Sequence, residues 1–166
     1  TYLPSVSEIL NGDRDLYQAM VAQMAFVDAQ FNNEEGENYL AIFDENAGQA
    51  LERFNQAVAR LEGTGVSDVA RWFDTAYERW LSSAQRVLQQ AETGDPEQAR
   101  SLAASETNEL FDNLRNYFDE VGAHADAQAQ IRAGEASSEG QSSSVTILLI
   151  TVVAILISIG LFAVFL

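Results

Sequence analysis

Apolar residues recur every three or four positions through most of this chain, and no stretch alternates apolar and polar residues as a strand does. Glycine and acidic residues interrupt the pattern near residue 36, at residues 63–65 and at residues 93–95. These interruptions divide the chain into four helical segments, at about 5–32, 38–62, 66–92 and 96–140. A heptad pattern sustained through each segment is typical of helices that pack as in a coiled coil.

Each segment has an apolar seam that we expect to form the core. The seam of the first segment consists of Val6, Leu10, Tyr17, Met20, Met24, Val27 and Phe31. That of the second consists of Leu40, Phe43, Ala47, Ala50, Phe54, Ala57 and Leu61. The third contributes Val66, Val69, Phe73, Ala76, Trp80 and Val87, and the fourth Ala103, Thr107, Leu110, Leu114, Tyr117, Val121, His124, Gln128 and Ile131. The short connections predict an all-α fold, an antiparallel up-down-up-down four-helix bundle.

The clearest helix start is the sequence Asp95-Pro96-Glu97. Asp is a favoured N-cap, proline fits the first helical position, and an acidic residue in the first turn complements the helix dipole. We therefore expect the fourth helix to begin here.

The chain ends in an uncharged run from Val145 to Leu166, and its last charged residue is Glu139. A helix of these 22 residues is about 33 Å long, enough to cross a bilayer core of about 30 Å. We predict that the fourth helix of the bundle continues into one transmembrane helix. The predicted domains are a bundle at residues 1–141 and a membrane span at residues 142–166.

The flank before this run is acidic, because Glu135 and Glu139 lie nearer to it than Arg132 does. Basic residues collect on the cytoplasmic side of a membrane span, so the bundle is expected outside, in the periplasm of a cell with an inner membrane. An antiparallel bundle also returns the start of its first helix to the membrane. We therefore expect an earlier span before Thr1 and a cytoplasmic part after Leu166.

The formal net charge is −16, with no lysine and no cysteine. Such a surface disfavours nucleic acid and anionic lipid headgroups as partners, although the apolar run implies contact with the bilayer interior. The absence of cysteine excludes disulfides and thiolate metal sites. We find no nucleophile–base pair, phosphate-binding loop or metal-hydrolase motif, so the sequence predicts no enzyme, metal site or cofactor.

The opening of the chain, Leu3-Pro4-Ser5 followed by Ile9-Leu10-Asn11-Gly12-Asp13-Arg14-Asp15-Leu16-Tyr17-Gln18-Ala19, resembles the sensory domain of methyl-accepting chemotaxis receptors. The length, the four-helix layout and the terminal span are similar to theirs throughout. The resemblance implies a homodimer through the first and last helices and a ligand bound outside. It also implies that a displacement of the fourth helix is transmitted through the membrane span to the cytoplasm. There, regions beyond Leu166 would bind cytoplasmic chemotaxis proteins.

The resemblance also implies where a ligand binds. Receptors for amino acids hold the ligand's carboxylates with arginines of the first helix, and Arg14 matches the first of them, whereas Ala19 and Gln23 stand where further arginines are expected. The candidate ligand-binding residues are Arg14, Asp13, Tyr17 and Gln18, and the ligand is an organic acid, an amino acid or an amine. A guanidinium forks two hydrogen bonds to a carboxylate.

Each of these residues also has an ordinary structural interpretation. Arg14 is placed to pair with the neighbouring aspartates. Asp13 occupies a core slot, where a carboxylate needs an arginine from another helix or a cationic ligand. Tyr17 belongs to the predicted core, unless its hydroxyl lines a pocket.

Three further features suit the interior or the surface of a bundle better than a site. The aromatic residues Trp72, Phe73, Tyr77 and Trp80 suggest a core more than a cage for an ammonium ligand. His124 is expected to be a hydrogen-bonded core or interface residue. The acidic run at residues 34–37 is expected to be a solvated loop.

Two other functions remain open from the sequence. A sensor histidine kinase has the same kind of outer bundle, and the residues after Leu166 would distinguish it. A membrane-anchored structural bundle that senses nothing would have no apolar span before Thr1.

Overall fold

The protein is all-helical. The computed structural model describes the backbone of residues 2–164 and the side chains of residues 3–137, and within residues 2–164 there is no strand. In chain order the elements are α1 (Tyr2–Asn32), α2 (Glu37–Arg60), α3 (Val66–Ala70), α4 (Phe73–Glu92), α5 (Pro96–Leu102), the π-helical turn η1 (Ala103–Thr107) and α6 (Asn108–Val164).

The predicted breaks between segments are confirmed. Gly65 precedes α3 with φ +90° and Gly94 precedes α5 with φ +96°, in the left-handed region that a side chain disfavours. The predicted start at Asp95 is also confirmed, because its carboxylate accepts a hydrogen bond from the backbone N–H of Gln98 at 3.1 Å and Pro96 occupies the first turn.

Two of the predicted segments are not single regular helices. The third is interrupted at Arg71 and Trp72, after a stretch whose valines, serine and aspartate have low helix propensity. The fourth begins as α5 and passes through the π-helical turn η1 before α6 starts at Asn108. A π-helical turn shifts the register of side chains along a helix, so the faces of α5 and α6 are not related by one continuous heptad.

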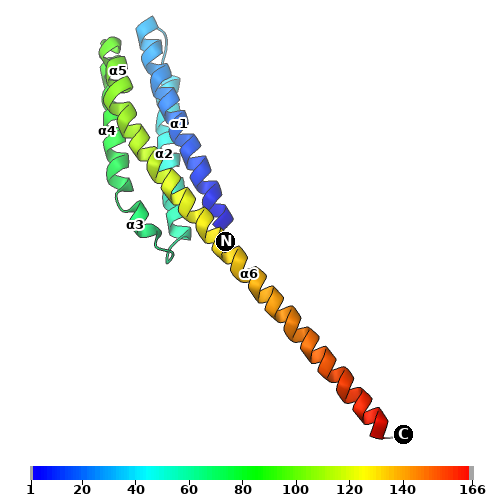
Figure 1. Ribbon diagram of the computed structural model, residues 1–166. Helices are drawn as coiled ribbons and strands as arrows, with labels where there is room; N and C mark the ends of the chain where they lie inside the picture. The colour runs from blue at the N-terminus through cyan, green and yellow to red at the C-terminus, as the bar shows by residue number, and fades with distance from the viewer. Residues whose placement is uncertain (1, 165–166) are drawn as a thin grey trace. The chain divides into compact units, whose positions relative to one another are not determined.

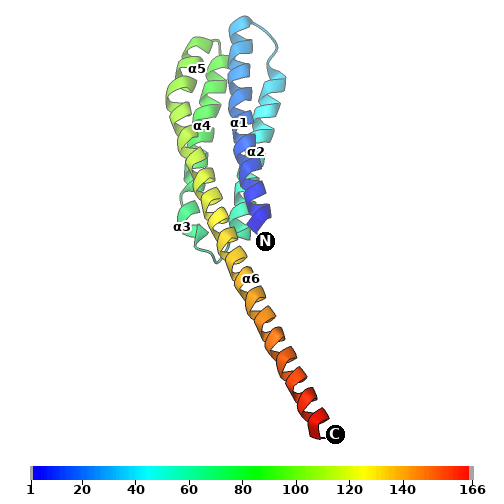
Figure 2. The same ribbon diagram turned by 45° about the vertical axis from the view of Figure 1, so that its right-hand side comes forward.

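Contacts divide the chain into two compact units, Thr1–Gln128 and Ala129–Leu166. In the first unit α1 packs mainly against α2, and α4 contacts both α1 and α5. Figures 1 and 2 show α1, α2, α4 and the first part of α6 lying side by side. The sequence-based boundary between residues 141 and 142 separates the bundle from the predicted membrane span, so it marks a different division of the chain. That boundary stays a prediction.

The core of the first unit contains a chain of aromatic rings contributed by three helices. Phe54 of α2 stacks on Phe73 of α4, with ring planes 8° apart, and meets Phe118 of α6 edge-on at 5.1 Å between ring centroids. Farther along, Phe43 of α2 packs against Trp80 of α4 at 6.0 Å. Most predicted seam residues of the second and third segments are buried. In the fourth segment Ala103, Thr107, Leu114 and Val121 are buried, whereas Ile131 is exposed.

The predicted seam of the first segment is largely wrong. Leu10, Tyr17 and Phe31 are exposed, and of the seven predicted residues only Val27 is fully buried. The face of α1 that enters the core consists instead of Ser5, Ile9, Gly12, Asp15, Leu16, Ala19, Ala22, Gln23, Phe26, Val27 and Ala29. This face is rich in small residues, which permit close approach of helices, and hydrophobicity alone does not identify it.

Gly12 illustrates why the small residues face inward. A Cβ atom at this position would lie 2.6 Å from the Phe118 ring and 3.3 Å from Cβ of Arg53. Both α2 and α6 therefore approach α1 closely at Gly12, and a side chain there would have to displace a buried ring.

Among the residues that the structure describes, we find no helix long and apolar enough to cross a membrane. The predicted span from Val145 to Leu166 falls outside the residues whose side chains are described. It stays a prediction from the sequence.

Candidate functional site

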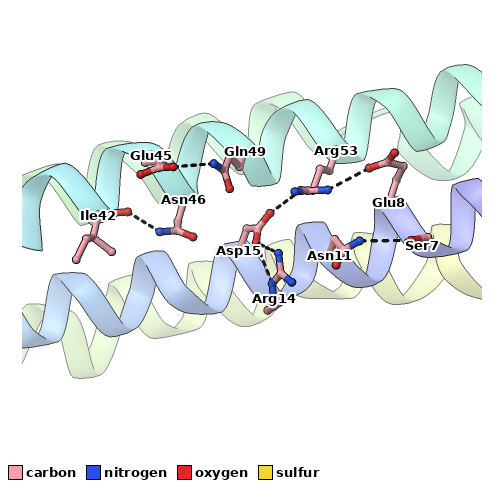
Figure 3. Close-up of polar contacts among 10 residues, drawn as sticks. All are labelled: Ser7, Glu8, Asn11, Arg14, Asp15, Ile42, Glu45, Asn46, Gln49 and Arg53. Atoms are coloured by element: carbon pink, nitrogen blue, oxygen red, sulfur yellow. Dashed lines mark hydrogen bonds and ion pairs between the residues drawn. The ribbon is translucent and has the colours of Figure 1, made fainter.

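Among the described residues of the first unit, the most buried charged group is the Asp15 carboxylate on α1, whose side chain is 1% exposed. Arg53 of α2 donates to one of its oxygens through Nε at 2.6 Å, and Arg14 donates to the other through Nε at 3.1 Å and Nη2 at 2.8 Å. Arg53 also donates to Glu8 at 3.4 Å, so the network continues along the α1–α2 contact (Figure 3). Two arginines thus compensate one buried carboxylate.

Asp13 is held by an arginine of another helix, one of the two partners predicted for an acid in this slot. Arg115 of α6 donates to both of its oxygens, through Nε at 2.6 Å and Nη2 at 2.9 Å. The hydrogen bond to Asp13 is the main cause that raises the pKa of Arg115 above its ordinary value, partly opposed by burial. This two-pronged contact fixes the first part of α6 against α1.

The candidate residues Arg14, Tyr17 and Gln18 lie on one exposed face of α1, because residues three and four positions apart share a helix face. The predicted core position of Tyr17 is wrong, since the residue is 51% exposed and its ring only borders Phe111 of α6, at 6.3 Å between centroids. Arg14 pairs with Asp15, which agrees with its structural interpretation. Arg14, Tyr17 and Gln18 therefore lie together on the exposed face, whereas the Asp13 side chain binds Arg115.

The exposed face of α1 is also apolar along most of its length. Leu3, Leu10, Tyr17, Met24 and Phe31 follow one another at intervals of seven residues, and Val21 lies beside them. Of these six residues, which we call the outer stripe, all but the half-buried Met24 are exposed. Within one chain the stripe makes few contacts, such as that of the Arg100 guanidinium over the Phe31 ring at 4.5 Å. A heptad of large apolar residues is what a second helix packs against.

The aromatic cluster of the third predicted segment is core, as expected, except for one ring. Phe73, Tyr77 and Trp80 are buried, and the Tyr77 hydroxyl donates to the carbonyl of Ala47 at 2.9 Å. Burial, together with the nearby Asp44 charge, raises the pKa of Tyr77 above its ordinary value. Trp72 is 63% exposed, and it lies at the break between α3 and α4.

Two minor candidates take the structural roles that the sequence suggested. His124 shares a hydrogen bond of 2.8 Å between its Nε2 and the Thr64 hydroxyl, so it is a hydrogen-bonded residue between segments, as expected. In the acidic run at residues 34–37 the three glutamates are exposed. Within residues 3–137 no three His, Asp or Glu side chains are placed to hold a metal ion.

The partners of the site residues could not be predicted from the sequence. Arg53 and Arg115 lie 38 and 102 residues from the aspartates they bind, and no local spacing signals such pairs. The sequence likewise gave no sign that Trp72 and Arg79 line a shared groove.

The chain matches no protein-family model, no curated protein and no solved structure with which it was compared.

Proposed function

We propose that this chain is the sensory part of a transmembrane receptor for a small solute. More particularly, we propose a bacterial chemoreceptor of the methyl-accepting kind, with its bundle in the periplasm and its output in the cytoplasm. The single observation that carries the proposal is the outer stripe of α1, which an isolated bundle has no reason to expose and which includes Tyr17 of the candidate ligand face.

The finer architecture belongs to the same proposal. Connections of a few residues at 33–36, 61–65 and 93–95 support antiparallel neighbours, and thus an up-down-up-down four-helix bundle. In this arrangement α5, η1 and the first part of α6 form the fourth helix. The uncharged run at residues 145–166 is then the transmembrane output element, and it contains no charged group that would resist a small displacement in lipid.

We place the ligand at the exposed Arg14, Tyr17 and Gln18. Arg14 is available because its carboxylate partner, Asp15, keeps a second cation in Arg53. When a ligand carboxylate draws Arg14 away, Asp15 therefore does not become an unpaired buried charge. The bidentate contact of Asp13 with Arg115 connects the same turn of α1 to α6, and this connection supports α6 as the element that carries the signal.

The experiment that tests the receptor proposal is a thermal-shift screen of the full chain in detergent micelles against organic acids, amino acids and amines. We expect at least one compound to raise the unfolding midpoint in proportion to the logarithm of its concentration, because a ligand that binds only the folded state stabilises it. Arg14→Ala should abolish the shift of at least one of these compounds, whereas Arg132→Ala, which removes an arginine outside the first unit, should abolish none. A screen in which no compound of the three classes shifts the midpoint would contradict direct sensing.

The homodimer is tested by single cysteines, because the chain contains none. If α1 packs against its copy in parallel, as anchoring of both chains in one membrane requires, Leu10→Cys places two thiols opposite each other and mild oxidation yields a covalent dimer. The matched control is Trp72→Cys, at an equally exposed apolar residue off the stripe. Equal cross-linking of Leu10→Cys and Trp72→Cys would refute the parallel dimer. So would a result in which the Tyr17→Cys variant cross-links and the Leu10→Cys variant does not, because that pattern is expected of an antiparallel pair.

A further inference from the structure

A groove in the first unit lies between α3, α4 and the first part of α6, and the residues that line it all belong to positions 68–120. Its volume is about 490 Å³, within the range that holds a small organic molecule. The lining is half apolar and half polar, and comprises Asp68, Val69, Trp72, Ala76, Arg79, Leu110, Asn113, Asn116, Tyr117 and Glu120.

Arg79 distinguishes this groove from the rest of the surface. Eight of the nine arginines form an ion pair with a carboxylate, and within the part of the chain that the structure describes Arg79 alone forms none. This is unexpected in a chain with 25 acidic residues. A guanidinium left without a carboxylate, at the wall of a groove, is suited to receive one from a ligand.

The rest of the lining indicates what the carboxylate should be attached to. Trp72 presents an exposed indole ring, and Tyr117 is held edge-on to the buried Phe73 at 6.1 Å, so one aromatic wall is fixed in place. Leu110 and Val69 extend the apolar surface. Burying the exposed ring of Trp72 against an apolar ligand removes that ring from water, which favours binding.

Two amides and two acids complete the groove. Asn113 and Asn116 of α6 supply N–H donors and carbonyl acceptors for the polar end of a ligand. Asp68 is already paired with Arg71 at 2.5 Å, so of the two lining acids only Glu120 lacks a cation within the described residues. An amino group on the ligand would find a partner in Glu120.

We propose that this groove binds a small carboxylate that carries an aromatic or aliphatic body, with Arg79 holding the carboxylate and Trp72 covering the body. The ligand is either a simple organic acid or an amino acid with an apolar side chain, which share this chemistry. The inference rests on the receptor proposal for the ligand's role as a signal, and it adds a second carboxylate site, within one bundle, to the candidate site on α1. The groove includes residues of α6, the proposed output helix.

The test uses the intrinsic fluorescence of the full chain in detergent micelles, with phenylacetate and L-phenylalanine as probes. Trp80 is buried, so a ligand that covers Trp72 changes the emission of the exposed ring and shifts it to shorter wavelength. We expect a saturable shift with at least one of the two carboxylates and none with 2-phenylethylamine, which has the same ring and the opposite charge. Tighter binding of L-phenylalanine would identify the ligand class as an amino acid, and tighter binding of phenylacetate would identify it as a simple organic acid. In Trp72→Phe the shift should disappear.

Arg79→Gln should weaken binding about tenfold or more, the loss expected for a charge-assisted contact. Arg79 is exposed and makes no ion pair within the described residues, so this variant should fold normally, as circular dichroism can verify. Arg86→Gln is the matched control, because Arg86 lies two turns along α4 and is paired with Glu106. Equal affinity in Arg79→Gln, binding of the amine alone, or no saturable shift with either carboxylate would overturn the proposal.

The same variants separate this inference from the receptor proposal. If phenylacetate and L-phenylalanine stabilised wild type and Arg79→Gln alike, but not Arg14→Ala, they would bind at the α1 face, which would overturn the groove and leave the receptor standing. The opposite result is saturable binding that depends on Arg79, together with a Leu10→Cys variant that forms no covalent dimer. This result would support the groove and contradict the receptor dimer.

Discussion

Replacing Trp80 with alanine is expected to destabilise the protein by about 3–5 kcal/mol, because it deletes the largest fully buried side chain of the described residues and leaves a cavity. The ring packs between Phe43 and Tyr77, two residues that link α4 to α2. For a chain of this length the loss corresponds to a fall in the unfolding midpoint of roughly 6–20 °C. Thermal unfolding followed by circular dichroism, with the full chain in detergent micelles, measures it.

The matched control is Trp72→Ala, which removes the same side chain from an exposed position. Its effect should stay within about 0.5 kcal/mol, because a surface substitution leaves no cavity. The indole Nε1 of Trp80 is buried without a hydrogen-bond partner among the described residues, so Trp80→Phe should lose less than alanine does. Similar losses in the two alanine variants would show that Trp80 is not a core residue.

The second large effect is expected at Asp15, where alanine should cost about 2–3 kcal/mol. Removing one partner of a buried ion pair is costly because the other charge remains, usually by about 3–5 kcal/mol. The cost is reduced here, since the side chains of Arg53 and Arg14 are 31% and 55% exposed and recover water when the carboxylate is lost. The unfolding midpoint should fall by roughly 4–12 °C.

Asp28→Ala is the control for Asp15, because Asp28 also accepts a short hydrogen bond from an arginine of another helix, Arg100 at 2.6 Å. Both partners of this second pair are substantially exposed, so its loss should cost at most about 1 kcal/mol. The difference between the two variants should persist in high salt, because salt screens exposed pairs more strongly than buried ones. Equal losses of stability in the two variants would mean that the burial of Asp15 adds nothing to the stability that its ion pairs provide.

These two sites differ in how far the sequence predicts them. Trp80 lies on the predicted seam of its segment, and periodicity alone places it in the core. Asp15 was not a predicted core residue, and its partner Arg53 belongs to another helix. A buried ion pair between distant residues leaves no local pattern, because its charges look like those of any solvated helix face.

The sequence by itself determined the elements that depend on neighbouring residues. The helical periodicity, the turns at Gly65 and Gly94 and the cap at Asp95 are local features, and the structure confirms them. It also determined the uncharged run at residues 145–166, whose transmembrane role stays a prediction.

Only the tertiary structure decided which face of α1 enters the core. The helix has a stripe of large apolar residues and a face of small ones, and the sequence favoured the larger residues at Leu10 and Tyr17. The structure buries the smaller face, because Gly12 and Ala19 allow the neighbouring helices to approach closely enough to exclude water. Packing density is a property of several helices together, and no single segment contains it.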